Sequence, residues 1–253
     1  MILHTDITGQ GTPLLLIHGL FGSYENLGMI ARLLADRFRI INIDLRNHGR
    51  SGHSSEMNYA LMAQDLTETM DALQLPCAAV LGHSMGGKAA MQLALSQPAR
   101  VSKLVLADIS PVISQARHIG ILQALSQIEL ATLVDRKQAD AELQLTISDA
   151  GTRAFLLKSL YKDDRGFHWR FNLSALQTRY HEVLAAPTAT GPYPGPVLFI
   201  KGGNSDYLLP EHQPTIRQLF PQAKAKVIEG TGHWLHAEKP AAFAKITADF
   251  LLS

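Results

Sequence analysis

The sequence predicts an α/β fold in which a mostly parallel sheet is flanked by helices. Short aliphatic runs alternate with helical stretches, and the runs end in glycine, aspartate or histidine. The runs are continuously apolar, as is typical of strands that are buried on both faces of a parallel sheet. We expect these strands at residues 14–17, 39–45, 78–81, 103–107, 196–200 and 225–228.

Helices are expected between the strands at residues 30–34, 59–73 and 240–252. Residues 110–194 differ from the rest, because heptad-like apolar spacing, many charges and few strand signals indicate several helices there. We therefore predict a single domain over residues 1–253, with residues 110–194 inserted as a helical cap.

One segment of the predicted cap is expected to be extended. Phe167, Trp169 and Phe171 alternate with polar residues just after the turn-like segment 163–166. Their rings could line a pocket beneath the cap, but an aromatic face of this kind more often packs into a core.

Composition excludes several classes of partner. Lysine and arginine number 23 against 22 aspartate and glutamate, so there is no basic surface for nucleic acid or an anionic membrane. Cys77 is the only cysteine, which excludes an internal disulfide. No signal-like leader or membrane-spanning run is present, so we expect a cytoplasmic protein without membrane insertion. Composition does not determine the oligomeric state.

The strongest local motif is Gly82-His83-Ser84-Met85-Gly86, between a predicted strand and a stretch rich in small residues. A serine in a tight strand-to-helix turn is exposed above the sheet edge, and flanking glycines relieve the crowding there. This context is typical of a nucleophile, and the positive end of the helix lies beside it. We therefore predict that Ser84 is a nucleophile.

A serine hydroxyl needs a base that takes its proton during attack. His233 is the best candidate, because its loop follows the last predicted strand and precedes the final helix. That loop lies at the same carboxyl-end edge of the sheet as Ser84. His236 is a competing base and could form a metal pair with His233, but no complete zinc-ligand motif accompanies them.

The remaining parts of such a site are an acid and an oxyanion hole. Asp108 and Asp206 compete for the acid, since each follows a predicted strand at this sheet edge. Backbone N–H groups usually stabilise the negative charge that develops on a carbonyl oxygen. We expect the N–H groups of Leu20, after the first strong strand, and of Met85, after the nucleophile, to form this hole.

A nucleotide-binding protein is the main alternative. Residues 82–88 also fit the phosphate-loop pattern G-x-x-x-x-G-K, and Asp108 ends a hydrophobic strand as a metal-binding aspartate would. However, Ala89 occupies the position where a magnesium-binding serine or threonine belongs. The nucleotide interpretation also leaves the Gly232-His233 loop unexplained. A binding protein without turnover is disfavoured, because the nucleophile, the base and an acid are all present.

The ordered motifs resemble the α/β-hydrolase superfamily and, within it, the YbfF-type bacterial esterases and their eukaryotic relatives. The resemblance covers nearly the whole chain, and the set is more specific than any single motif. The motifs are HGLFGS at 18–23, RNHGRS at 46–51, GHSMGGKA at 82–89, DISPV at 108–112, GGNS at 202–205 and GHWLHAEKP at 232–240.

The resemblance implies a sheet of about eight strands with a helical cap inserted after the sixth. It implies hydrolysis of a small-molecule acyl ester or thioester through an acyl-enzyme, without metal or cofactor. The substrate is not determined, because the scaffold also hosts thioesterases and carbon–carbon bond hydrolases. Relatives share GGNS but vary at the next position, whereas the aspartate of DISPV resembles a family mark. This implies that Asp108 rather than Asp206 completes a triad with Ser84 and His233.

Overall fold

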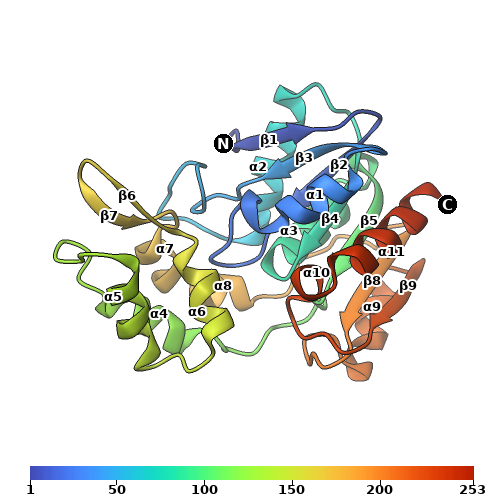
Figure 1. The fold of residues 1–253 in the computed structure, drawn as a ribbon. Coiled ribbons are helices and arrows are strands. Elements are labelled where there is room, and N and C mark those ends of the chain that lie inside the picture. The colour runs from blue at the N-terminus through green and yellow to red at the C-terminus, as the bar shows by residue number, and fades with distance from the viewer.

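A seven-stranded sheet forms the centre of the computed structural model, which describes residues 1–253 (Figure 1). Its strand order is β1-β3-β2-β4-β5-β8-β9, and every neighbouring pair is parallel except the edge pair of β1 and β3. The predicted α/β class and mostly parallel sheet are confirmed. The strands are β1 (Thr5–Thr8), β2 (Thr12–Ile17), β3 (Phe38–Ile43), β4 (Ala78–His83), β5 (Val101–Ala107), β8 (Val197–Gly202) and β9 (Ala223–Ile228).

Helices cover both faces of this sheet. Alternate residues of β2 show the two layers: Leu14 and Leu16 belong to the apolar cluster under α1 and α11, whereas Leu15 and Ile17 belong to the cluster under α2 and α3. This alternation follows from the period of two in an extended strand. The helices outside the segment between β5 and β8 are α1 (Gly28–Leu34), α2 (Tyr59–Ala72), α3 (Met85–Ser96), α9 (Gln213–Leu219), α10 (Leu235–Glu238) and α11 (Pro240–Leu252).

The sheet has one strand fewer than the resemblance implied, and the insertion follows the fifth strand of the chain, β5, rather than the sixth. The residues that lead into the edge strand β1 belong to no strand. Leu3 N–H donates to Thr69 Oγ1 at 2.9 Å and His4 N–H donates to Ser51 Oγ at 2.8 Å. Side chains therefore accept the hydrogen bonds of this segment, and it adds no further strand to the sheet.

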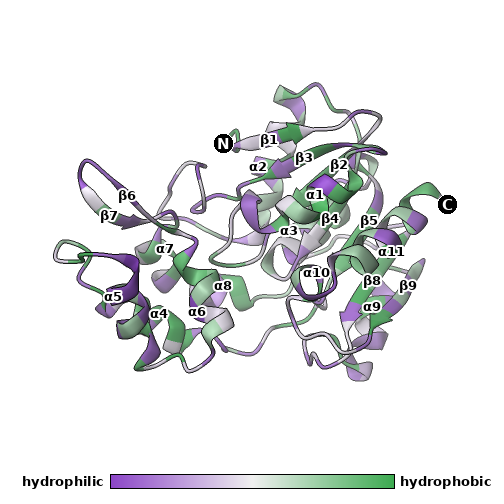
Figure 2. Cartoon of the chain, viewed as in Figure 1, coloured by the Kyte–Doolittle hydropathy of each residue, from purple (hydrophilic) through white to green (hydrophobic).

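A helical insertion lies between β5 and β8, to one side of the sheet (Figure 1). Its outer helix α5 is strongly hydrophilic and buries only Ala139 and Leu143 (Figure 2). None of the helices combines the length and the apolar character that a membrane span requires. The elements of the insertion are α4 (Ile119–Gln127), α5 (Arg136–Gln144), α6 (Ala150–Leu157), β6 (Leu160–Asp163), β7 (Gly166–Trp169), α7 (Leu173–Thr178) and α8 (Tyr180–Leu184).

The extended segment predicted within the insertion is confirmed for Phe167 and Trp169, which lie in β7 of the antiparallel β6–β7 hairpin, whereas Phe171 follows the hairpin. Trp169 and Phe171 are buried and stack with ring centroids 5.2 Å apart. Phe171 also meets Phe21 of the main domain edge-on at 5.5 Å. These two rings therefore join the insertion to the rest of the core.

Tight packing of glycines beneath α3 generates a stability prediction. A Cβ added at Gly86 would lie 2.3 Å from the His18 carbonyl oxygen, whereas one added at Gly120 in α4 would meet nothing within 4 Å. Gly86→Ala is expected to lower the free energy of unfolding by about 3 kcal/mol, because backbone must move. The control Gly120→Ala should leave it unchanged or raise it by up to about 1 kcal/mol. Equal urea-unfolding midpoints for the two variants would contradict this packing.

Candidate active site

Ser84 lies in a strained turn between β4 and α3, with φ of 53° and ψ of −120°. Residues other than glycine rarely adopt this backbone conformation, so the surroundings of Ser84 must hold it in place. A Cβ added at Gly82 would lie 2.3 Å from the Gly86 carbonyl oxygen. Gly82 and Gly86 must therefore both be glycine for the turn to close. Ser84 lies at the N-terminal end of α3, as predicted.

His233 connects the serine to an aspartate. Its Nε2 lies 3.0 Å from Ser84 Oγ, and its Nδ1 lies 2.8 Å from Asp108 Oδ2. The ring of Tyr207 stacks on the imidazole with centroids 3.7 Å apart. His236 makes no hydrogen bond to the serine and instead packs on His83 at 4.4 Å. The structure thus places His233, and not the competing histidine, beside the serine.

Asp108 is fully buried and is held by three groups. Gly202 N–H donates to Oδ1 at 3.0 Å, while the Ser205 hydroxyl and the His233 ring both contact Oδ2. A carboxylate that accepts several hydrogen bonds has little freedom to rotate. Asp108 therefore presents a defined oxygen to His233. The motif GGNS, which contains Ser205, does not by itself reveal this contact.

The competing aspartate lies outside this arrangement. The side chain of Asp206 is 59% exposed and pairs with Arg117, whose Nη1 lies 2.7 Å from Oδ1. The Arg117 hydrogen bond lowers the pKa of Asp206 below its ordinary value. Asp206 makes no hydrogen bond to His233, which receives its carboxylate contact from Asp108.

The residues that carry the two predicted oxyanion donors, Leu20 and Met85, line one cavity together with Ser84. Met85 is the first residue of α3, so its N–H has no partner within the helix. The loop of Leu20 approaches closely, because a Cβ added at Gly19 would lie 3.3 Å from Ser84 Cβ. His18 braces this loop: its Nδ1–H donates to the Gly19 carbonyl at 2.7 Å, and its Nε2 accepts from Leu45 N–H at 3.1 Å.

Buried histidines around the site are held in their neutral form. Burial lowers the pKa of His18 to about 4 and that of His236 to about 3. Burial also lowers the pKa of His83 well below its ordinary value, and its Nε2–H donates to the His233 carbonyl at 2.9 Å. Near neutral pH these three rings therefore add no positive charge beside His233.

Comparison with known proteins decides the family. Residues 14–246 match the model of the Alpha/beta hydrolase family. The chain belongs to this family. As an α/β hydrolase it is 42% identical over 243 residues to esterase YbfF of Escherichia coli (strain K12), covering 96% of this chain and 94% of the relative.

Two further relatives support the assignment of this α/β hydrolase. It is 41% identical over 243 residues to the sn-1-specific diacylglycerol lipase ABHD11 of Mus musculus, covering 93% of this chain and 79% of that protein. The solved structure of a marine microorganism esterase superposes with a TM-score of 0.96 at 36% identity, covering 98% and 99% of the two chains. The protein is therefore an enzyme, a serine α/β hydrolase of the esterase and lipase type.

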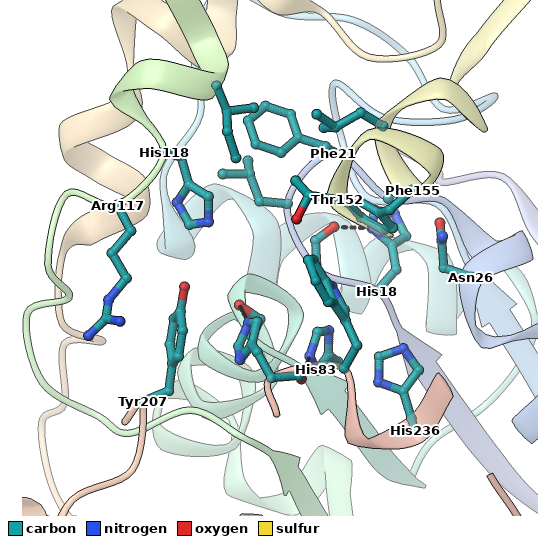
Figure 3. Close-up of a pocket in the computed structure, with 18 of the residues that line it drawn as sticks. His18, Phe21, Asn26, His83, Arg117, His118, Thr152, Phe155, Tyr207 and His236 are labelled. Carbon is teal, nitrogen blue, oxygen red and sulfur yellow. Dashed lines mark hydrogen bonds between the residues drawn. The ribbon is translucent and has the colours of Figure 1, made fainter. Parts of the chain in front are cut away.

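A cavity of about 220 Å³ opens above Ser84 of this α/β hydrolase (Figure 3). Side chains of the insertion cover it from one side, and loops at the carboxyl ends of the strands form the other. Sequence analysis did not predict these walls, because the lining side chains are far apart in the chain. They include Phe21, Arg117, His118, Ile121, Thr152, Phe155, Leu156, Tyr207 and Trp234.

The phosphate-loop alternative fails at its lysine. Lys88 is buried, and its ammonium donates to the carbonyls of Leu184 and Ala185 at 3.0 and 2.7 Å. Burial lowers its pKa to about 7. Two of its three N–H groups are thus bound to backbone oxygens, whereas a nucleotide-binding lysine points toward phosphate.

The two aspartates give the site its sharpest prediction. Asp108→Asn is expected to lower kcat/KM by about 10³- to 10⁴-fold, because an amide cannot hold His233 in the required tautomer. Asp206→Asn is the matched control and should remain within about twofold of wild type, since it removes only an exposed ion pair. Circular dichroism should first show that both variants are folded, and kcat/KM is then compared. A severe loss in Asp206→Asn with an active Asp108→Asn would exchange the two roles.

Proposed function

We propose that the protein hydrolyses carboxylic esters of small molecules through a covalent acyl-enzyme on Ser84. The observation that carries the proposal is the continuous hydrogen-bonded line from Ser84 Oγ through His233 to Asp108. The names of two relatives, an esterase and a diacylglycerol lipase, also describe cleavage of a carboxylic ester. In this proposal residues 110–194 act as a cap over the site of the single domain 1–253.

In the first half-reaction Ser84 Oγ attacks the carbonyl carbon while His233 Nε2 takes its proton. The negative charge that develops on the carbonyl oxygen is stabilised by the N–H groups of Leu20 and Met85. Asp108 orients the ring of His233 and stabilises the imidazolium. His233 then gives the proton to the leaving oxygen, the carbon–oxygen bond breaks, and the alcohol departs.

In the second half-reaction water attacks the acyl-enzyme. His233 takes one proton from the water as it adds, and the oxyanion contacts form again. Collapse of the intermediate breaks the bond to Ser84 Oγ, which recovers a proton from His233. The carboxylic acid leaves, and the enzyme returns to its starting state.

Acyl thioesters form a second candidate substrate class, because attack by Ser84 on a thioester carbonyl follows the same steps. A thiolate leaving group is a weaker base than an alkoxide, so its departure depends less on protonation by His233. Acyl-coenzyme A thioesters therefore belong in the same screen as esters.

A cytoplasmic location stays a prediction of the sequence.

Ser84→Ala tests the proposed function. Hydrolysis of p-nitrophenyl esters is expected to fall by about 10⁶-fold, because the attacking atom is lost. Labelling by a fluorophosphonate probe should disappear with it. Ser126→Ala, which removes an exposed hydroxyl in α4, is the control and should keep both signals.

The same assay separates the alternatives. Esterase activity should survive a chelator, because acyl transfer through serine needs no metal ion. Equal hydrolysis by Ser84→Ala and wild type would overturn the proposal. A strict requirement for added magnesium would instead favour nucleotide chemistry at residues 82–88.

A further inference from the structure

Two cavities meet at Ser84. The larger is the cavity of about 220 Å³ described above, and the smaller holds about 20 Å³. Leu20, Ser84, His118 and Tyr207 line both cavities, so the two adjoin at the serine. His233 lines only the larger one, which makes the two sides of Ser84 chemically different.

The tetrahedral intermediate of the proposed reaction determines what each side can hold. Its central carbon carries Ser84 Oγ, the oxyanion, the leaving oxygen and the acyl chain. The leaving oxygen must face His233 Nε2, because that nitrogen supplies its proton. The oxyanion faces the N–H groups of Leu20 and Met85. The acyl chain takes the remaining direction, away from His233, where the smaller cavity extends past Leu20 and Met85 to Ile109, Val183 and Leu184.

We propose that the smaller cavity is the acyl subsite, that it admits short acyl groups, and that the larger cavity holds the alcohol. This inference rests on the proposed function. At about 20 Å³, the smaller cavity has room for about one water-sized group. The preferred acyl groups therefore carry about one or two carbons beyond the carbonyl, as in acetyl and propionyl esters.

The far wall of the smaller cavity is tied to the main domain by hydrogen bonds. The Tyr59 hydroxyl donates to the Val183 carbonyl at 2.6 Å, and Lys88 donates to the next two carbonyls along the chain. One turn further along α3, the Gln92 amide donates to the Thr188 carbonyl at 3.0 Å and its oxygen accepts from Thr188 N–H at 2.8 Å. A longer acyl chain would have to break these contacts.

The chemistry of Lys88 adds a second limit. Its buried ammonium forms part of the wall of the smaller cavity, so an alkyl chain placed there would remove it further from polar surroundings. The larger cavity has more room and carries apolar side chains on the side of the insertion, with Ile121 from α4 and Phe155 from α6 among them. Bulky apolar groups are therefore better accommodated on the alcohol side.

Two ester series test the assignment in the wild-type enzyme. In the first, p-nitrophenyl acetate, butyrate and octanoate vary the acyl chain. In the second, ethyl, hexyl and 1-naphthyl acetates vary the alcohol. We expect kcat/KM to fall by about 100-fold from acetate to octanoate, since misfit in a closed pocket costs one to two orders of magnitude. The alcohol series should show no comparable fall with size.

Val183→Ala should enlarge the acyl subsite, because Val183 lines only the smaller cavity and its carbonyl hydrogen bond is kept. We expect the butyrate-to-acetate ratio of kcat/KM to rise by about tenfold. Ile121→Ala, which changes only the larger cavity, is the matched control and should leave that ratio unchanged. Leu184→Ala carries the same test if Val183→Ala does not fold.

The outcomes separate this inference from the proposed function. Faster hydrolysis of octanoate than acetate by wild type, with an acyl preference that responds to Ile121→Ala, would overturn the subsite assignment while hydrolysis through Ser84 remains. Absence of hydrolysis in both series, together with an unlabelled Ser84, would overturn the proposed function itself.

Discussion

The turn at Ser84 is the constraint on which the rest of the site depends. An L residue keeps a φ of 53° only where its surroundings leave no alternative. Here Gly82 and Gly86 pack without side chains between β4, α3 and the backbone that ends β2. The loop that carries Leu20 follows directly from β2, so one packed unit positions both the serine oxygen and the oxyanion donors. Any movement of α3 would therefore displace the nucleophile, the Met85 N–H and the wall of the acyl subsite together.

A second strained residue completes the arrangement from the other side. Asp108 has a φ of 50°, and its carboxylate is satisfied by Gly202 N–H, the Ser205 hydroxyl and His233. The neighbouring histidines are neutral through burial, so the positive charge formed during attack is confined to the one ring that contacts this carboxylate. Tyr207 stacks on one face of that ring, and the Nε2 atom of the ring contacts the serine hydroxyl.

Most of this framework could be predicted from the sequence, because buried parallel strands are continuous aliphatic runs and the residues Ser84 and His233 lie in glycine-flanked loops after such runs. The edge strand β1 could not, since three of its four residues are exposed and only antiparallel pairing with β3 defines it. The preference for Asp108 depended on a family resemblance. The contact of Ser205 with it joins segments about one hundred residues apart, and the stacking of Tyr207 on His233 joins the loops after β8 and β9. Only the tertiary fold brings these residues together.

The central claim is that Ser84 Oγ becomes acylated with His233 as its base. Rapid acid quenching of the enzyme with p-nitrophenyl acetate, followed by peptide mass spectrometry, tests it most directly. The account predicts one acetyl group per chain, on Ser84, in wild type and in His236→Ala, and none in His233→Ala over the same reaction time. Acetylation of a different residue, or unchanged acetylation of Ser84 in His233→Ala, would contradict it.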